Sequence, residues 1–286
     1  MWGLGQIPEK RSSVLRRWLR PVIKWFYKNA AGFIGYSRHA CAVYEPYGKP
    51  TYLASNAVLP APSDDQRALV DAAIRSRGGG SVLDLVYIGA LTPQKHVAKL
   101  LAALTAIPGP RPRLHVIGEG SEEARLRTLA RQSGLERSVI FHGALYDDAA
   151  KWEVLRGCDL GVLPGRGGLA IQELMFYGIP VISGVADGTE RDMIDPRRTG
   201  FLIDGVPTPD DLRREILRFR DLSASERATM ARAAAAAMWN EINVDRMAGA
   251  FVEAILTTLG QQGSSGTRSG WPALSRRPWQ PPHEQP

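Results

Sequence analysis

The chain has 286 residues, 44% of them hydrophobic and 23% charged, which is enough to bury one large core or two small ones. Its net charge of +7 favours anionic partners, namely nucleoside diphosphates, acidic membrane surfaces or nucleic acid, without choosing among them. The cysteines, Cys41 and Cys158, are too few and too far apart to suggest a disulfide framework or a metal site. No apolar run is long enough for a membrane span or a signal peptide, so we expect a cytoplasmic protein, either free or peripheral at the inner membrane face.

The N-terminal segment predicts one amphipathic helix. Met1–Gln6 is expected to be a loop, and a helix capped by Ser12 or Ser13 should run to Lys28 with a kink at Pro21. One side of this helix is basic and the other apolar; the basic residues are Arg16, Arg20, Lys24 and Lys28, and the apolar ones are Leu15, Trp18, Leu19, Val22, Trp25 and Phe26. Such a helix either lies in a membrane interface or packs its apolar side on protein, and the second case is the commoner one. Basic residues elsewhere are scattered, so we do not expect nucleic-acid binding.

Residues 31–80 predict short elements. Two strands, Gly32–Ser37 and Thr51–Ser55, are expected on either side of a helix over Arg38–Tyr47 that a glycine ends. Pro60–Asp65 is predicted to be a linker and Arg67–Arg77 a helix, which three consecutive glycines stop.

From Val82 onward, strands and helices alternate regularly. The predicted strands are Val82–Ile88, Arg113–Ile117, Val139–Phe141, Leu160–Leu163, Val181–Ile182 and Gly200–Ile203. The predicted helices are Val97–Thr105, Glu122–Gln132, Asp148–Arg156, Ala170–Tyr177, Asp210–Phe219, Ser223–Met238 and Asp245–Leu259. This alternation predicts an α/β fold with a doubly wound, Rossmann-like parallel sheet. The Gly-, Ser- and Pro-rich tail, residues 261–286, is expected to be disordered.

A glycine-rich turn joins two of these predicted elements. Gly165–Gly168 follows the strand Leu160–Leu163 and precedes the helix Ala170–Tyr177. A backbone without Cβ atoms can approach a phosphate closely, and the first N–H groups of a helix attract an anion. Glu173, one turn further along, is placed to accept hydrogen bonds from ribose hydroxyls.

This stretch resembles the nucleotide-sugar segment of family 4 glycosyltransferases, which have the GT-B fold. That family has two glutamates eight residues apart, followed by Gly-x-Pro-Val. Here Glu173 matches the second glutamate and Gly178–Val181 the four residues after the helix, whereas Gly165 stands at the first glutamate. In the family that first carboxylate is thought to hold the donor sugar.

Three further turns resemble the same family. Gly89, Leu91 and Lys95 match its phosphate-binding Gly-Arg-Leu…Lys-Gly turn, with Ala90 at the arginine and His96 at the second glycine. A second turn, with Gly118 and Gly120, matches the family's turn at the end of the next strand. A third turn, Gly143, Ala144 and Leu145, matches the segment whose backbone reads the nucleotide base in the family. The resemblance implies Lys95 and Glu173 as catalytic residues and no metal. The implied donor-binding residues are Gly89, Lys95, Gly118, Gly120, Gly143, Ala144, Leu145, Arg166, Gly167, Gly168, Leu169 and Glu173.

The resemblance implies a retaining transferase that moves a hexosyl group from a nucleoside-diphosphate sugar to an alcohol, without a cofactor. It divides the chain into a remnant of the acceptor-side domain (1–59), a linker with a helix (60–80), a nucleotide-sugar-binding domain (81–260) and the tail (261–286). Because residues 1–59 are much shorter than the acceptor-side domain of the resembled family, we expect a truncated enzyme that is inactive alone. The alternatives are a non-catalytic nucleotide-sugar-binding module and one subunit of a split enzyme, whose partner would be a separate acceptor-domain subunit. A third possibility, a nucleotide-sugar epimerase on the same fold, would need acidic catalytic residues that the sequence does not identify.

Overall fold

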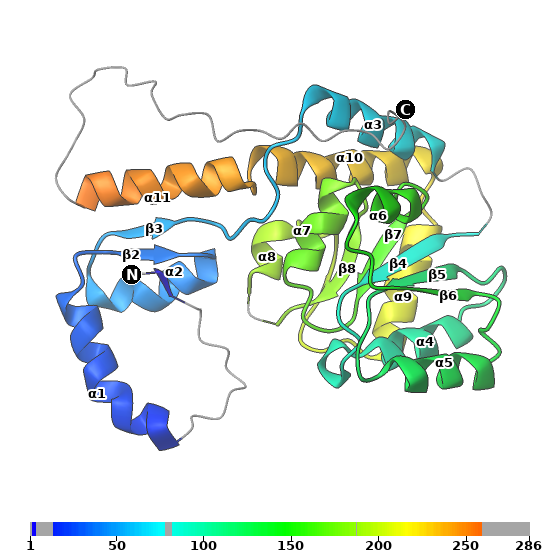
Figure 1. The fold of residues 1–286 in the computed structure, drawn as a ribbon, viewed down its shortest axis with the longest axis horizontal. Helices are drawn as coiled ribbons and strands as arrows, with labels where there is room; N and C mark the ends of the chain where they lie inside the picture. The colour runs from blue at the N-terminus through cyan, green and yellow to red at the C-terminus, as the bar shows by residue number, and fades with distance from the viewer. Residues whose placement is uncertain (1, 4–13, 78–81, 187, 259–286) are drawn as a thin grey trace.

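The computed structural model describes residues 2–3, 14–77, 82–186 and 188–258. They form a smaller N-terminal part around a three-stranded sheet and a larger part around a six-stranded sheet (Figure 1). The predicted disordered tail, 261–286, lies outside the described residues. None of the described helices combines the length and the apolar character that crossing a membrane requires.

All six strands of the larger sheet run parallel, in the order β6-β5-β4-β7-β8-β9. Their bounds are β4 (Asp84–Ile88), β5 (Arg113–Ile117), β6 (Val139–Gly143), β7 (Leu160–Leu163), β8 (Val181–Gly184) and β9 (Gly200–Ile203). The chain therefore starts the sheet in the middle, builds one half through β5 and β6, and returns beside β4 to build the other. This is the Rossmann-type order, so the predicted α/β fold is confirmed.

Helices cover both faces of this sheet. Figure 1 shows α3 and α10 on one side of the strands and α4, α5 and α9 on the other, and α10 contacts both α3 and α7. Their bounds are α3 (Asp64–Ser76), α4 (Val97–Thr105), α5 (Glu123–Gln132), α6 (Asp148–Leu155), α7 (Leu169–Phe176), α8 (Glu190–Met193), α9 (Pro209–Arg220) and α10 (Ala224–Asn240). Because the sheet is covered twice, every residue of β7 and β8 is buried, which explains their continuous apolar runs.

The N-terminal part has its own small core. Its strands β1 (Trp2–Gly3), β2 (Phe33–Gly35) and β3 (Thr51–Leu53) pair in parallel, and its helices are α1 (Val14–Asn29) and α2 (Arg38–Tyr44) followed by a short 3₁₀ helix, η1 (Glu45–Tyr47). Phe33 of β2 stacks on Tyr44 of α2 with ring centroids 4.4 Å apart. The last helix, α11 (Val244–Thr258), leaves the larger part and runs along β3, as expected from the resembled fold (Figure 1).

Three differences from the predicted elements have identifiable reasons. Trp2–Gly3, expected within a loop, is a two-residue strand because it pairs with β2. Helix α3 begins three residues before the predicted Arg67, inside the predicted linker, because Ser63 and Gln66 form a capping box. The four-residue helix α8 was not predicted at all, since it is too short to show a period.

Candidate functional site

The order of the large sheet reverses between β4 and β7, and the loops after these strands leave at the same edge. In open parallel sheets, ligands bind at such a reversal, outside the carboxyl ends of the strands. The loop after β4 carries Gly89 and Lys95, and the loop after β7 carries Gly165–Gly168. The two loops with the strongest sequence signals therefore flank the position where this fold binds ligands.

The loops after β4, β5 and β6 meet through glycine backbones. The Gly118 N–H donates to the Gly143 carbonyl at 2.7 Å. A Cβ on Gly118 would lie 2.0 Å from the Gly89 carbonyl oxygen, and one on Gly120 would lie 2.4 Å from the Leu91 carbonyl oxygen. Larger residues at these positions would push the loops apart. The glycines therefore allow the backbones of the neighbouring loops to pack in direct contact.

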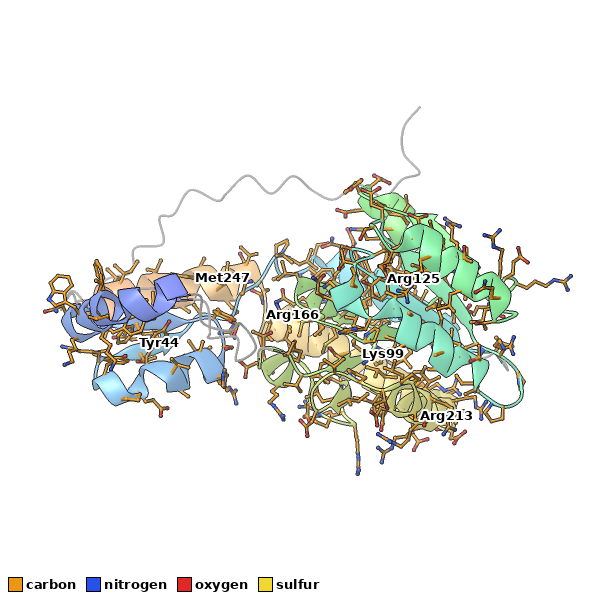
Figure 2. The ribbon with its side chains drawn as sticks, turned by 90° about the horizontal axis from the view of Figure 1, so that it is seen from below. Tyr44, Lys99, Arg125, Arg166, Arg213 and Met247 are labelled. Atoms are coloured by element: carbon orange, nitrogen blue, oxygen red, sulfur yellow. The ribbon has the colours of Figure 1, made fainter. Side chains whose placement is uncertain are left out.

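The glycine turn after β7 leads directly into α7. Gly168 precedes the first residue of the helix, Leu169, and has φ 54°, in the left-handed region that favours glycine. The first N–H groups of α7 have no partner within the helix and carry the positive end of its dipole. Arg166, labelled in Figure 2 where the two parts of the molecule meet, is exposed next to this turn. The N–H groups of Ala170 and Ile171 donate to the carbonyl oxygens of Gly167 and Gly168 at 3.2 Å. The turn therefore offers the positive end of the α7 dipole and one guanidinium to an anion.

Lys95 joins the loops across the reversal of the sheet. It ends the short 3₁₀ helix η2 (Pro93–Lys95), and its Nζ donates to the carbonyl oxygen of Arg166. Burial lowers the pKa of Lys95, and the nearby charge of Arg166 lowers it further. No salt bridge to Lys95 is found within the described part of the chain. An anionic ligand would stabilise the charged form of Lys95, which is partly buried and lies near a second cation, Arg166.

Glu173 is paired with Lys151, a residue that the sequence analysis missed. The Nζ of Lys151, in the first turn of α6, lies 2.6 Å from the Oε1 of Glu173 on α7, and their side chains are 13% and 24% exposed. Burial lowers the pKa of Lys151, but the hydrogen bond and charge of Glu173, with that of Asp148, outweigh it and raise the pKa above its ordinary value. Glu173 thus stands as a carboxylate held by a cation, one turn beyond the glycine turn.

The structure gives a physical reason for one of the three departures from the family pattern. A Cβ on Gly165 would lie 2.4 Å from the Gln94 carbonyl oxygen and 2.7 Å from the Lys95 Cα, so the loop is closed too tightly for the family's glutamate. His96, at the family's glycine, has φ 53°, which a glycine would adopt without strain. For Ala90 the structure shows only that its carbonyl accepts a hydrogen bond from the Tyr87 hydroxyl at 2.9 Å.

The loop after β6 contains the residues expected near the base. Gly143 has φ 73°, and Ala144 and Leu145, which follow it, are half-buried. His142 lies beside this loop, with its Nε2 3.0 Å from the Nδ1 of His115. Burial lowers the pKa of His142, and the charge of His115 lowers it further. His142, in β6, is thus paired with a residue of the neighbouring strand β5.

A small cavity lies between the two parts of the molecule, next to the glycine turn. It has a volume of about 170 Å³ and is lined by Gly168 and Leu169 from the turn and by Tyr36, Ser55 and Asn56 from the N-terminal part. No group of three His, Cys, Asp or Glu side chains that could hold a metal ion occurs among the described residues. The loops that carry Gly89, Gly118 and Gly143 thus contact one another. Lys95 contacts the glycine turn, and this cavity adjoins Gly168.

Comparisons with known proteins agree with this geometry. The chain is 34% identical over 121 residues to a GDP-mannose-dependent alpha-mannosyltransferase of Mycolicibacterium smegmatis, an alignment that covers 41% of this chain and 29% of the relative. It is 32% identical over 126 residues to a lipopolysaccharide 1,6-galactosyltransferase of Salmonella typhimurium, covering 41% of this chain and 34% of the relative. The chain therefore matches about a third of the length of these relatives.

Solved structures share the fold. HepE from Anabaena in complex with UDP superposes with a TM-score of 0.68 at 20% identity, covering 89% of this chain and 71% of that one. The C-terminal domain of the group 1 glycosyl transferase LpcC from Francisella tularensis has a TM-score of 0.51 at 17% identity, covering 64% of this chain and 95% of that one. The sequence model of the glycosyl transferases of group 1 matches residues 80–237, which is more than half of the chain. The chain therefore belongs to the group 1 glycosyl transferases, which are the family 4 enzymes that its motifs resemble.

Proposed function

We propose that this chain binds a nucleoside-diphosphate sugar at the carboxyl edge of its six-stranded sheet and serves in the transfer of the hexosyl group, with retention, to an alcohol. The observation that supports the proposal is the contact of Lys95 with the glycine turn Gly165–Gly168, at the point where the order of the strands reverses. Both relatives described above are sugar transferases, and HepE was solved with UDP.

Each group at this site has a defined task in the proposal. Lys95, Arg166 and the amides at the start of α7 stabilise the negative charge that develops on the leaving diphosphate. Glu173 accepts hydrogen bonds from the ribose, and the backbone of Gly143–Leu145 faces the base. In this proposal the sugar end of the donor faces the cavity beside Gly168, which both parts of the molecule line.

The second candidate is a nucleotide-sugar-binding module, or one subunit of a split enzyme, that binds the donor without transferring its sugar. Gly165 favours it, because the carboxylate expected to hold the sugar is absent and the loop has no space for one. Titration with UDP-sugars and GDP-sugars tests the binding that both candidates share. Release of free UDP or GDP that depends on an added alcohol acceptor then separates the transferase from the binding module.

Replacing Lys95 with alanine should weaken nucleoside-diphosphate binding by about 1 kcal/mol or more, because a charge-assisted contact is lost. Calorimetric titration with UDP and with GDP measures the change, and the affinity of the unmodified chain should fall as salt rises. Unchanged affinity in a folded K95A variant would remove Lys95 from the site.

The lowered pKa of Lys95 adds a pH dependence to the same measurement. As pH rises, Lys95 loses its proton earlier than an ordinary lysine, so diphosphate affinity should fall on the alkaline side. The variant K95R stays charged in that range and is the matched control, since its affinity should fall less steeply. Parallel curves for the two proteins would show that another group titrates.

Helix α1 is proposed to contact an anionic membrane surface. Lys24 and Lys28 are exposed, and Trp25 and Phe26, which are 61% and 50% exposed, line an apolar groove of about 540 Å³ beside Ile255 of α11. The side chains of Arg16 and Arg20, the other two basic residues predicted on this helix, are not among those that the structure describes. Basic and aromatic side chains on one exposed helix are typical of peripheral membrane contacts.

The protein should therefore sediment with vesicles that contain anionic lipid, and each charge near the surface should add about 1 kcal/mol. The variant K24E/K28E should release it, whereas R125E/R131E, which changes the net charge equally on exposed residues of α5, should not. Equal release by both variants, or no sedimentation of the unmodified chain, would leave α1 as an ordinary surface helix.

A further inference from the structure

Lys151 occupies a position that is unfavourable for a cation unless a carboxylate faces it. It lies in the first turn of α6, where the helix dipole opposes positive charge, and its side chain is only 13% exposed. Asp148, on the same turn, is 3.6 Å away and 68% exposed, so it supplies little compensation. Glu173 is the close partner, at 2.6 Å, and it comes from another helix.

The pair connects the two segments that flank the ribose position. Helix α6 follows the base loop Gly143–Leu145 after a short turn, and α7 follows the glycine turn Gly165–Gly168 directly. A second contact between these helices lies nearby, where the rings of Trp152 and Tyr177 are 5.4 Å apart. The ion pair between the Lys151 ammonium and the Glu173 carboxylate therefore links the helix that follows the base loop to the helix that follows the glycine turn.

We propose that Lys151 is the positioning residue for the ribose-binding carboxylate, an inference that rests on the proposed function. By holding Oε1 of Glu173, Lys151 leaves Oε2 to accept from the ribose hydroxyls. It also neutralises a carboxylate that would otherwise repel the neighbouring diphosphate. The nucleotide is thereby recognised as a ribonucleotide, because a deoxyribose would leave the oriented oxygen without its donor.

The test compares ribonucleotides with their deoxy counterparts. Affinities of UDP and GDP, and of their 2′-deoxy and 3′-deoxy forms, are measured on the full chain and on K151M. The unmodified chain should prefer a ribonucleotide over at least one deoxy form by about tenfold, the value of a hydrogen bond to a charged group. In K151M that preference should fall below about threefold, because the carboxylate is no longer oriented.

The control for removing a cation from α6 is R156M. Arg156, which caps the carboxyl end of α6, is 56% exposed and paired with Glu153 instead of Glu173. This variant should keep the tenfold preference. A K151M variant that binds UDP more weakly but keeps its full preference for ribose would overturn the proposal, because a purely structural role would give that result.

A second pair of variants keeps the proposal testable if K151M does not fold. E173Q and the double variant K151M/E173Q avoid an unpaired buried carboxylate. If Lys151 acts through Glu173, the two should bind UDP within about twofold of each other, since coupled residues are not additive. A further loss in the double variant contradicts the proposal. An unmodified chain that binds UDP and GDP without preferring ribose overturns this inference alone, whereas one that binds neither overturns the proposed function as well.

Discussion

A glutamate introduced at position 165 should destabilise the protein by about 3 kcal/mol instead of completing the donor site. Gly165 stands where the resembled family has its first glutamate, so G165E is the obvious restoring substitution. A Cβ there would overlap the backbone at Gln94 and Lys95, at 2.4 Å and 2.7 Å. Backbone atoms cannot turn aside as a side chain does, so one loop must move. Chemical denaturation should show the loss, and UDP affinity should fall because Lys95 is displaced.

Two variants separate the possible causes of this loss. G165A adds the same Cβ without a charge and should lose nearly as much stability as G165E. G249E adds the same side chain at an exposed glycine of α11, where a Cβ meets nothing within 4 Å. It should not destabilise the protein, because replacing a glycine inside a helix gains about 0.5 kcal/mol. A G165E protein as stable as the unmodified chain, with tighter binding of a nucleotide sugar, would mean that the loop opens freely in solution.

The fold was largely predictable from the sequence because local signals agreed with the global arrangement. Predicted and observed bounds coincide for β5, β7, β9 and α4, and differ by a few residues for the other predicted elements of the larger part. Buried parallel strands appear as short apolar runs, and the glycines that end them mark the turns. The carboxyl edge of the sheet, and hence the place of Gly89, Gly118 and Gly165–Gly168, follows from that alternation.

The side-chain contacts of the site were not predictable, because they join residues far apart in the chain. Lys151 and Glu173 are separated by 22 positions, and neither position shows a local pattern that predicts the other. The tight contact of Gly165 with Gln94 likewise depends on how two loops pack after the sheet has formed. A signal could have been found for Lys151 alone, since a cation in the first turn of a helix is unfavourable and therefore suggests a carboxylate partner.

Arg77 is a second residue whose importance only the structure reveals. Predicted simply as the last residue of a helix, it directs its guanidinium at the carboxyl ends of α6 and α7, where it donates to the carbonyl oxygens of Leu155, Arg156, Tyr177 and Gly178. Burial lowers the pKa of Arg77 to about 10, so the group remains a cation at neutral pH. A cation at two helix carboxyl ends also offsets both dipoles.

Replacing Arg77 with methionine should therefore lower the free energy of unfolding by about 3–4 kcal/mol, because four carbonyl groups lose a charged donor. R77K keeps the charge but not the planar fork of donors, so it should recover only part of this loss. R75M, an exposed change on the same helix, should alter stability by less than about 0.5 kcal/mol. Chemical denaturation of the three variants gives the comparison.

The same substitution should also weaken UDP binding, although Arg77 lies at the opposite ends of the two helices from the ligand. Lys151 and Glu173 belong to α6 and α7, so releasing the far ends of these helices lets the pair separate. The preference for ribose should then decrease in R77M even at temperatures where the protein is fully folded. UDP at a hundred times its dissociation constant stabilises a folded protein by about 2.7 kcal/mol, so saturating ligand should recover most of the lost stability. A folded R77M protein with unchanged ribose preference would show that each helix is held in place by the sheet alone.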